Sequence, residues 1–275
     1  MDADALFDEA IATLRANRVE EARDLFARAG AAGRHDAAVI HCNLTASGGD
    51  WPGGMRLLAE LARTDLRCRR QFELIRAMDL SATLSGEVVS EAPHLTLFRG
   101  LFTAAECGYL IEAAAPMLAP SVVVDPATGA QRPDPVRVSD SAGFTLPLEN
   151  PAVHALNQRL AAASGTGWAE GEPLQVLRYR PGGQYKPHFD ALPGLANQRI
   201  LTMIVWLNED YEGGETLFIK TGAKLKGRAG DALLFRNALP DGRRDPDSGH
   251  AGLPVIRGEK LIASRWIRAR PFELA

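Results

Sequence analysis

The sequence has few cysteines, and none of them form a close pair. Cys42, Cys68 and Cys107 are the three cysteines among 275 residues, and no CxxC motif occurs. This wide spacing argues against a disulfide framework and a zinc knuckle, and it favours reduced thiols in the cytosol. We therefore expect each cysteine to be a small buried apolar residue and the protein to be cytoplasmic.

A long apolar run and an excess of charge of one sign are also missing. No stretch approaches the roughly 20 apolar residues that a membrane-spanning helix needs, and residues 1–14 lack the basic start and apolar run of a secretory signal. The 31 basic and 34 acidic residues nearly balance, for a formal net charge of −3. We expect neither a membrane nor a nucleic acid as a partner. The length allows a self-sufficient enzyme with a substantial core.

Residues 1–85 are rich in Ala, Leu and Arg and predict a small all-helical region. Apolar residues recur along it at helical spacing. Turn signals near Asn17, at Gly30 and Gly33, and over residues 47–50 divide it into short helices.

A period of about thirty residues indicates that these helices repeat as stacked hairpins. The pairs Leu25-Phe26 and Leu57-Leu58 lie thirty-two residues apart in similar surroundings. Residues 17–30 resemble tetratricopeptide or Sel1-type repeats in a degenerate form. The sequence leaves two roles open for this region: packing on a catalytic domain, or binding a partner.

The residue composition and its pattern change between residues 82 and 93, and we expect a second domain over residues 90–275. Short β-rich runs separated by Gly, Pro, Asn and Asp are typical of an antiparallel sandwich or barrel. The candidate strands are His94–Phe98, Ser121–Val124, Val136–Ser139, Leu174–Arg180, Ile200–Leu207, Ala232–Phe235 and Leu261–Arg268.

Two helices are expected among these strands. One covers Thr103–Met117, where Thr103 and Glu106 form a capping box. The other covers Pro151–Ser164, with Asn150 as its cap and proline at its first position. Helices followed by a run of strands predict an α+β fold in which helices flank a double-sheet jelly roll.

The most informative residues are His188 and Asp190. Alternate side chains of an extended chain share a face, so both can enter one cavity and bind one metal. A third ligand has to come from elsewhere, and His250 follows later candidate strands that can bring it across the cavity. Two histidines and one carboxylate on one face leave open positions on the metal, as in non-haem iron(II) oxygenases. The remaining histidines, assigned to structure or surface, are His35, His41, His94 and His154.

A dense series of short motifs runs through residues 174–270. They are Tyr179, Pro181-Gly182, Tyr185, His188, Asp190, Arg199, Thr202, Trp206-Leu207-Asn208, Glu212-Gly213-Gly214-Glu215-Thr216, Gly230–Phe235, His250–Val255, Gly258-Glu259-Lys260 and Trp266. In this order they resemble the catalytic core of the prolyl 4-hydroxylase group of iron(II)- and 2-oxoglutarate-dependent dioxygenases. With Arg137-Val138-Ser139 upstream, the likeness covers about two thirds of the chain. It implies a double-stranded β-helix, the cupin-like form of the jelly roll.

The resemblance also implies roles for three further residues. Lys260, ten residues after His250, matches the lysine that pairs with the far carboxylate of 2-oxoglutarate. Tyr179, nine residues before His188, matches a tyrosine that donates a hydrogen bond to that cosubstrate. Thr202 occupies a strand position that often lines the same pocket. The polar loop 236–249, directly before His250, is either solvated or a rim for the substrate.

The implied activity is hydroxylation of an unactivated C–H bond with Fe(II), 2-oxoglutarate and O2, coupled to release of succinate and carbon dioxide. Ascorbate is a candidate reductant. The implied substrate is a prolyl residue in a peptide or protein, and the alternative is a free amino acid or another small metabolite. A zinc hydrolase would also use His and Asp ligands, but it gives no reason for Lys260 and Tyr179. A non-catalytic helical-repeat scaffold gives no reason for a complete ligand set.

Overall fold

The computed structural model describes residues 2–79, 84–124, 131–133 and 136–272. Contacts group these residues into two compact units. One unit holds residues 2–79 together with Phe144–Arg159, and the other holds the described residues from 84 to 143 and from Leu160 to Phe272. The first unit thus includes a separate segment from later in the chain. The division of the chain between residues 85 and 90 stays a prediction.

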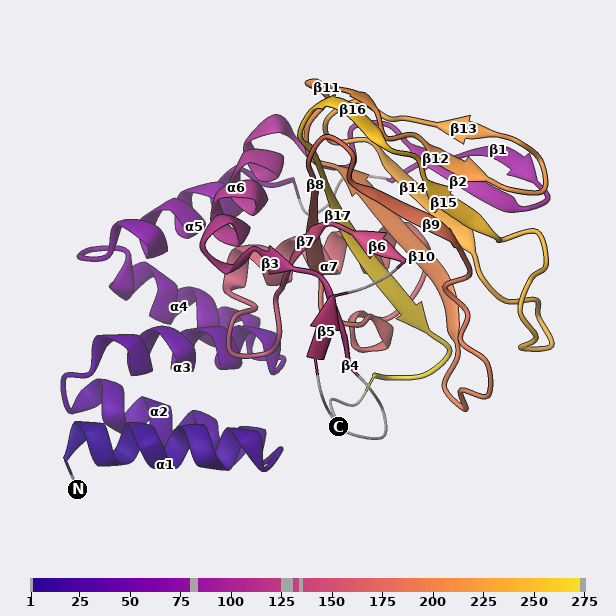
Figure 1. Ribbon diagram of the computed structural model, residues 1–275. Coiled ribbons are helices and arrows are strands. Elements are labelled where there is room, and N and C mark those ends of the chain that lie inside the picture. Colours follow the sequence, from indigo (N-terminus) through magenta and orange to yellow (C-terminus); the bar gives the residue numbers. More distant parts are fainter. Residues whose placement is uncertain (1, 80–83, 125–130, 134–135, 273–275) are drawn as a thin grey trace. The chain divides into compact units, whose positions relative to one another are not determined.

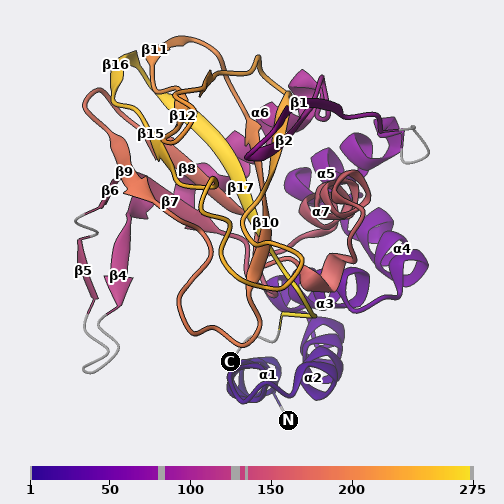
Figure 2. The ribbon, with the colours of Figure 1, turned by 90° about the vertical axis from the view of Figure 1, so that its right-hand side faces the viewer.

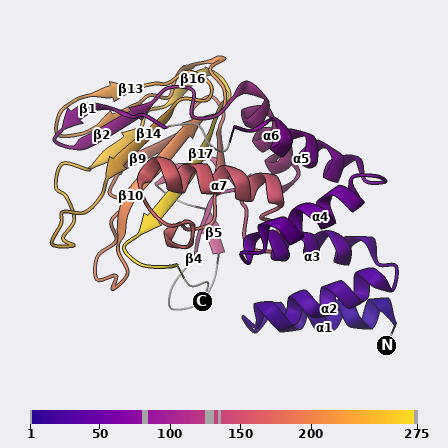
Figure 3. The same cartoon turned by 180° about the vertical axis from the view of Figure 1, so that it is seen from behind.

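The first unit begins with a series of short helices (Figures 1 and 3). They are α1 (Ala3–Arg15), α2 (Val19–Ala31), α3 (His35–Ser47), α4 (Trp51–Leu61) and α5 (Leu66–Ala77). Asn17 and Gly33 adopt positive φ values of 59° and 100° in the first two turns, where Asn and Gly meet the least steric cost. The predicted helical region is therefore confirmed, and the likeness to tetratricopeptide or Sel1 repeats remains a prediction.

Small residues let consecutive helices of this unit pack closely. A Cβ added at Gly30 of α2 would lie 3.0 Å from the Cβ of Ala38 in α3, and one added at Gly54 of α4 would lie 2.6 Å from that of Ala46. The core beneath these contacts is apolar and includes Leu6, Ala10, Ala22, Phe26, Ala29, Ala37 and Leu44. Among the described residues, no helix has the length and apolarity needed to cross a membrane.

The two helices expected later in the chain are present. In α6 (Ala104–Ala114), Thr103 caps the first turn, Glu106 completes the capping box, and a short 3-10 turn follows at Ala115–Met117. In α7 (Pro151–Ser164), the Asn150 side chain accepts hydrogen bonds from two amides of the first turn. A second 3-10 turn covers Trp168–Glu170.

The second unit is a jelly roll of two facing antiparallel sheets. The larger sheet has the order β1-β2-β14-β10-β17-β8-β7-β3 and the smaller one the order β13-β12-β15-β9-β6. Figure 2 shows β9 and β15 of the smaller sheet beside β17 of the larger sheet. The larger sheet contains β1 (Glu87–Glu91), β2 (His94–Phe98), β3 (Ala119–Pro120), β7 (Asp140–Gly143), β8 (Gln175–Tyr179), β10 (Arg199–Trp206), β14 (Ala232–Arg236) and β17 (Lys260–Arg268).

The smaller sheet and two separate strand pairs complete the unit. The sheet contains β6 (Arg137–Val138), β9 (Gln184–His188), β12 (Thr216–Phe218), β13 (Lys224–Leu225) and β15 (His250–Gly252), and the pairs are β4 (Val122–Val124) with β5 (Gln131–Pro133) and β11 (Tyr211–Gly213) with β16 (Val255–Gly258). Every strand expected from the sequence overlaps one of these elements. The strands that the sequence did not predict include β11, β12 and β16, each of only three or four residues.

Alternating side chains of the two sheets form the core between them. Tyr179, Ile204, Trp206 and Phe235 of the larger sheet pack with Phe218 of the smaller one. Strand β17 is buried along its whole length, so both of its faces are covered, although it carries Lys260, Ser264, Arg265 and Arg268 among its apolar residues. The centre of the unit is thus a closed apolar barrel, and polar side chains inside it need specific partners.

Candidate metal centre

Two histidines face each other on neighbouring strands of the smaller sheet. His188 ends β9 and His250 begins β15, and they are directly opposite in the ladder between these strands. Their ring centroids lie 4.2 Å apart. The Nδ1 of His188 donates to the carbonyl of Lys186 at 2.8 Å, and the Nδ1 of His250 donates to that of Ser248 at 2.9 Å. With both Nδ1 atoms occupied in this way, each Nε2 keeps a lone pair for a metal.

Asp190 lies two residues after the end of β9 and completes the cluster. One carboxylate oxygen lies 3.6 Å from the Nε2 of His188, and the other lies 3.8 Å from the Nε2 of His250. One nitrogen or oxygen atom from each side chain lies within 4.8 Å of the other two. The three residues predicted from the sequence are therefore brought together around one point.

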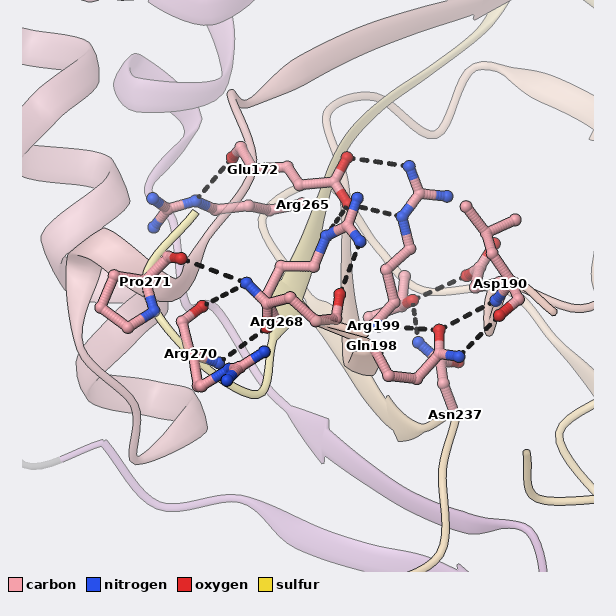
Figure 4. Close-up of polar contacts among 12 residues, drawn as sticks. Glu172, Asp190, Gln198, Arg199, Asn237, Arg265, Arg268, Arg270 and Pro271 are labelled. Carbon is pink, nitrogen blue, oxygen red and sulfur yellow. Dashed lines mark hydrogen bonds and ion pairs between the residues drawn. The ribbon is translucent and has the colours of Figure 1, made fainter. Parts of the chain in front are cut away.

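A buried hydrogen-bond chain fixes the Asp190 carboxylate (Figure 4). The Thr202 hydroxyl donates to it at 2.6 Å, and the Asn237 amide donates to the Thr202 hydroxyl at 2.7 Å. Thr202 and Asn237 are both almost fully buried. The oxygen engaged by Thr202 is held in one orientation, because both members of the chain lie in a packed interior where their side chains have little freedom to rotate.

These three side chains fit an iron(II) ion. The Nε2 of His188 is buried and has no hydrogen-bond partner, which is costly unless it binds a ligand. Ligand atoms around one ion, each at roughly 2.1 Å, lie at most about 4.2 Å from one another, close to the spacings found here. Two imidazoles and one carboxylate on one side of an ion form the facial set of non-haem iron(II) oxygenases.

The local charges keep the cluster ready for a cation. Burial opposes ionisation of Asp190, but the charges of His250 and His188 and the hydrogen bond from Thr202 hold the pKa of this carboxyl below its usual value. Burial lowers the pKa of His250, although the Asp190 charge opposes the shift. The anionic carboxylate and the neutral imidazole are the forms that bind a metal.

The cavity beside this cluster extends into the barrel. Its wall includes Tyr179, Thr202 and Lys260, the three residues assigned to the cosubstrate from the sequence, together with Tyr185, Thr216, Ile262, Ser264 and Trp266. Thr202 therefore lies on the pocket wall as expected, and its hydroxyl also supports Asp190.

Lys260 is a buried cation in this cavity. Only 3% of the residue is exposed, and its ammonium donates to the carbonyl of Gly214 at 2.7 Å. Burial lowers the pKa of Lys260 from 10.5 to about 8, with Lys226 adding to the shift and Glu215 opposing it. Among the residues that the structure describes, Lys260 forms no ion pair. A buried ammonium that donates to a single carbonyl is a strong site for an anion.

Tyr179 lies next to this cation. It is directly opposite Lys260 in the ladder between β8 and β17. Burial raises the pKa of Tyr179, so the phenol keeps its proton at neutral pH. It can therefore donate a hydrogen bond to an oxygen in the cavity.

Sequence reasoning gave no role to Tyr185 or Asn237. The Tyr185 ring stacks on that of His188, with centroids 3.5 Å apart and an angle of 16° between the planes. Tyr185 already belonged to the motif series, three residues before His188, which was a usable signal. Asn237 follows β14 with no pattern around it, and only the folded chain shows that it reaches Thr202.

A buried ionic network joins two strands of the larger sheet (Figure 4). Arg199 and Arg268 are directly opposite on β10 and β17, and both pair with the carboxylate of Glu172. The Arg199 guanidinium lies 4.1 Å from the ring centroid of Trp266, a residue of the cavity wall. The carboxylate offsets the repulsion between two opposed arginines, one of which packs on Trp266.

The loop between β14 and β15 is anchored at both ends. Asn237 at its start reaches Thr202, and Ser248 at its end accepts from His250. The amide of Asp245 donates to the carbonyl of Asn237, which closes the base of the loop. Residues 240–244 are exposed. The loop is exposed at its tip and at Pro246, and its base supports the metal ligands.

Comparison with known proteins places these residues in a family. Residues 174–268 match the 2OG-Fe(II) oxygenase superfamily. The chain is 37% identical over 203 residues to prolyl 4-hydroxylase 1 of Arabidopsis thaliana, which covers 67% of this chain and 72% of that protein. It is 34% identical over 212 residues to probable prolyl 4-hydroxylase 3 of the same plant, covering 68% and 74% respectively.

A solved structure agrees with the sequence matches. The viral collagen prolyl hydroxylase of Paramecium Bursaria Chlorella virus-1, in its 2OG complex, is 29% identical with a TM-score of 0.52 and covers 66% of this chain and 99% of its own. The span matched to the superfamily contains all six residues assigned from the sequence, namely Tyr179, His188, Asp190, Thr202, His250 and Lys260.

Proposed function

This chain belongs to the prolyl 4-hydroxylase family of 2OG-Fe(II) oxygenases, and we propose that it hydroxylates a prolyl residue in a peptide or protein. As a member of this family it is a dioxygenase that uses Fe(II), 2-oxoglutarate and O2. The observation that carries the proposal is the cluster of His188, Asp190 and His250 beside a buried cation, in a chain similar to several prolyl 4-hydroxylases.

We assign the iron to His188, Asp190 and His250. The bound iron supplies open positions for the 2-oxo acid and dioxygen and the oxidising power that the C–H bond requires. The carbonyls of Lys186 and Ser248 orient the two imidazoles. The apolar barrel around the cluster limits access of water, which protects the site from side reactions.

We assign the far carboxylate of 2-oxoglutarate to Lys260 and Tyr179. The cosubstrate is a dianion, and the ammonium and the phenol are donors on one wall of the cavity. An ammonium in a desolvated pocket attracts a carboxylate far more strongly than one in water. With its far carboxylate anchored there, the 2-oxo acid end of the molecule is directed toward the three ligands.

A peptide or protein is the substrate class that the named relatives favour. A free amino acid or another small metabolite is the alternative outcome. The helices of residues 2–79 are a candidate surface for holding a protein partner. The cytoplasmic location stays a prediction from the cysteine pattern, and the three thiols are unpaired and buried.

The deciding experiment offers peptides and free amino acids to the purified enzyme. We incubate it with Fe(II), 2-oxoglutarate and ascorbate, and score each compound by mass spectrometry for the gain of one oxygen. We expect the gain on proline within peptides, and fragmentation of the product then locates the hydroxyl. Oxygen gain only on free amino acids would support the metabolite alternative. Succinate released without any substrate reports the oxygenase activity separately.

A further inference from the structure

A groove runs along the edge of the jelly roll where the chain passes from β6 in the smaller sheet to β7 in the larger one. The turn between β8 and β9 forms its other side. Its lining combines exposed apolar groups with arginines: Pro120, Arg137, Val138, Asp140, Arg178, Arg180 and Pro181. It is distinct from the cavity of the metal cluster, whose wall contains none of these residues.

Two contacts connect this groove to the metal cavity. The Arg137 guanidinium lies 5.5 Å from the ring centroid of Tyr185, and Tyr185 stacks on His188. Ser139, also in the groove, lies close enough to the Tyr179 phenol to lower its pKa, against the larger effect of burial. A polypeptide that lies in the groove therefore lies directly behind residues that line the metal cavity.

The charges in the groove are unbalanced. Arg178 and Arg180 both approach the same carboxylate oxygen of Asp140, at 2.8 Å and 3.0 Å. Among the residues that the structure describes, Asp140 is the one carboxylate in the lining, against three arginines. Outside the groove, Arg180 has a further carboxylate, Glu259, at 3.5 Å.

Arg178 alone is sufficient to form the structural ion pair with Asp140. It lies directly opposite Asp140 in the ladder between β7 and β8, and its guanidinium donates to Asp140 through two nitrogens. Arg180 adds a second guanidinium to the same oxygen while 57% of its side chain stays exposed. An exposed pair of this kind contributes little to stability, so the second arginine calls for another explanation.

We propose that this groove binds an acidic residue of the polypeptide substrate through Arg180, which makes an acidic residue near the target proline a determinant of specificity. The inference rests on the proposed function. A guanidinium binds a carboxylate through two parallel hydrogen bonds. The neighbouring Pro120, Val138 and Pro181 supply apolar contacts for the backbone and proline rings of an extended peptide.

The test is a scan of one glutamate along a neutral, proline-containing peptide. Each glutamate peptide is paired with its glutamine counterpart, and kcat/KM is measured for both. We expect the ratio for glutamate over glutamine to reach about fivefold on one side of the proline, the upper range of an exposed ion pair. The ratio should fall toward one as NaCl is raised, because salt screens the pair.

Variants assign the effect to the groove. Arg180→Gln leaves Asp140 its partner Arg178, so the fold is retained, and we expect the ratio at the preferred position to drop to about one. Arg257→Gln is the matched control: Arg257 is exposed and paired with Glu212 outside the groove, and the ratio should stay at its unmodified value.

Two results would overturn the proposal. One is a ratio near one at every position, and the other is a preference that persists in Arg180→Gln. Both are measured on peptides that are hydroxylated, so either result leaves the prolyl hydroxylase assignment intact. Failure to hydroxylate any peptide, with succinate still released, would instead reject the assigned substrate class and the groove proposal together.

Discussion

Lys260 and Tyr179 are directly opposite on β17 and β8, and the ammonium lies 5.3 Å from the centre of the phenol ring. The ring face stabilises the buried charge, while the carbonyl of Gly214 accepts a hydrogen bond from one N–H of the ammonium. The remaining protons of the ammonium are available to an incoming anion. This arrangement separates cosubstrate binding from metal binding, and the two can be tested independently.

Replacing Lys260 by methionine should weaken cosubstrate binding selectively. A buried charge-assisted hydrogen bond is lost, so we expect the Kd of 2-oxoglutarate to rise about 10- to 100-fold. Methionine has a similar length and leaves the metal cluster untouched. Titration calorimetry under anaerobic conditions with Mn²⁺ as the metal measures both affinities. Equal loss of metal and 2-oxoglutarate binding would contradict the role given to Lys260.

Cosubstrate binding should also depend on pH. Burial lowers the pKa of Lys260 to about 8, so the ammonium is present below that pH and is lost above it. Affinity for 2-oxoglutarate is therefore expected to fall as the pH rises through about 8, with the bound dianion moving the loss upward. Titrations between about pH 6.5 and 9.5 on the unmodified enzyme and Lys260→Arg provide the check. Arginine stays charged, so a parallel decline in both proteins would exclude Lys260 as the cause.

His188→Ala should abolish metal binding and the release of succinate. The substitution removes one of three ligands and leaves the buried site without a complete facial set. His94→Ala is the matched control, because His94 is a partly buried histidine that pairs with Glu91 on the outermost strand pair of the larger sheet. Succinate release and Mn²⁺ titration are the readouts. Metal affinity unchanged in His188→Ala would refute the assigned ligand set.

Thr202→Val should weaken the metal through Asp190. Valine keeps the shape of threonine but removes the hydroxyl that orients the carboxylate and accepts from Asn237. Loss of a group that positions a ligand typically costs about tenfold in metal affinity. Thr202→Ser restores the hydroxyl and should bind Mn²⁺ nearly as well as the unmodified enzyme. The role of Thr202 would be purely steric if valine and serine gave the same affinity.

Glu172→Gln should destabilise the fold. Arg199 and Arg268 face each other on neighbouring strands, and Glu172, with 9% of its side chain exposed, is the carboxylate between them. Breaking a buried ion pair costs about 3 to 5 kcal/mol of unfolding free energy, which urea denaturation measures. Glu212→Gln, at an exposed pair with Arg257, should cost less than about 1 kcal/mol. Similar losses in the two variants would show that burial does not matter here.

Strand alternation anticipated much of this site. It placed His188 and Asp190 in one cavity, and the structure brings their metal-binding atoms within reach of each other. It also put Lys260 on the face of β17 that carries Ile262, Ser264 and Trp266, and all of these residues line the cavity. Local periodicity suffices for such predictions, because the side chains of one strand share a face whatever its partners are.

Pairing between distant strands was beyond such reasoning. The register that sets His250 opposite His188 depends on how the loop before β15 closes, and no local pattern encodes that length. The contact between Asn237 and Thr202 likewise depends on how strands distant in the sequence pair. The Glu172 network joins a loop residue to two strands, and charged residues spaced far apart in the sequence give no sign that they will meet.

The anchored loop between β14 and β15 has a consequence for engineering. Its two roots hold the iron ligands and their supports, but the hydrogen bond from the Leu239 amide to the Arg243 carbonyl closes off the tip as a small hairpin of its own. Extra residues added at the tip would extend into solvent without altering the geometry of the roots. A fluorophore, an affinity handle or a tethered substrate peptide attached there would extend from a loop whose two roots stay fixed.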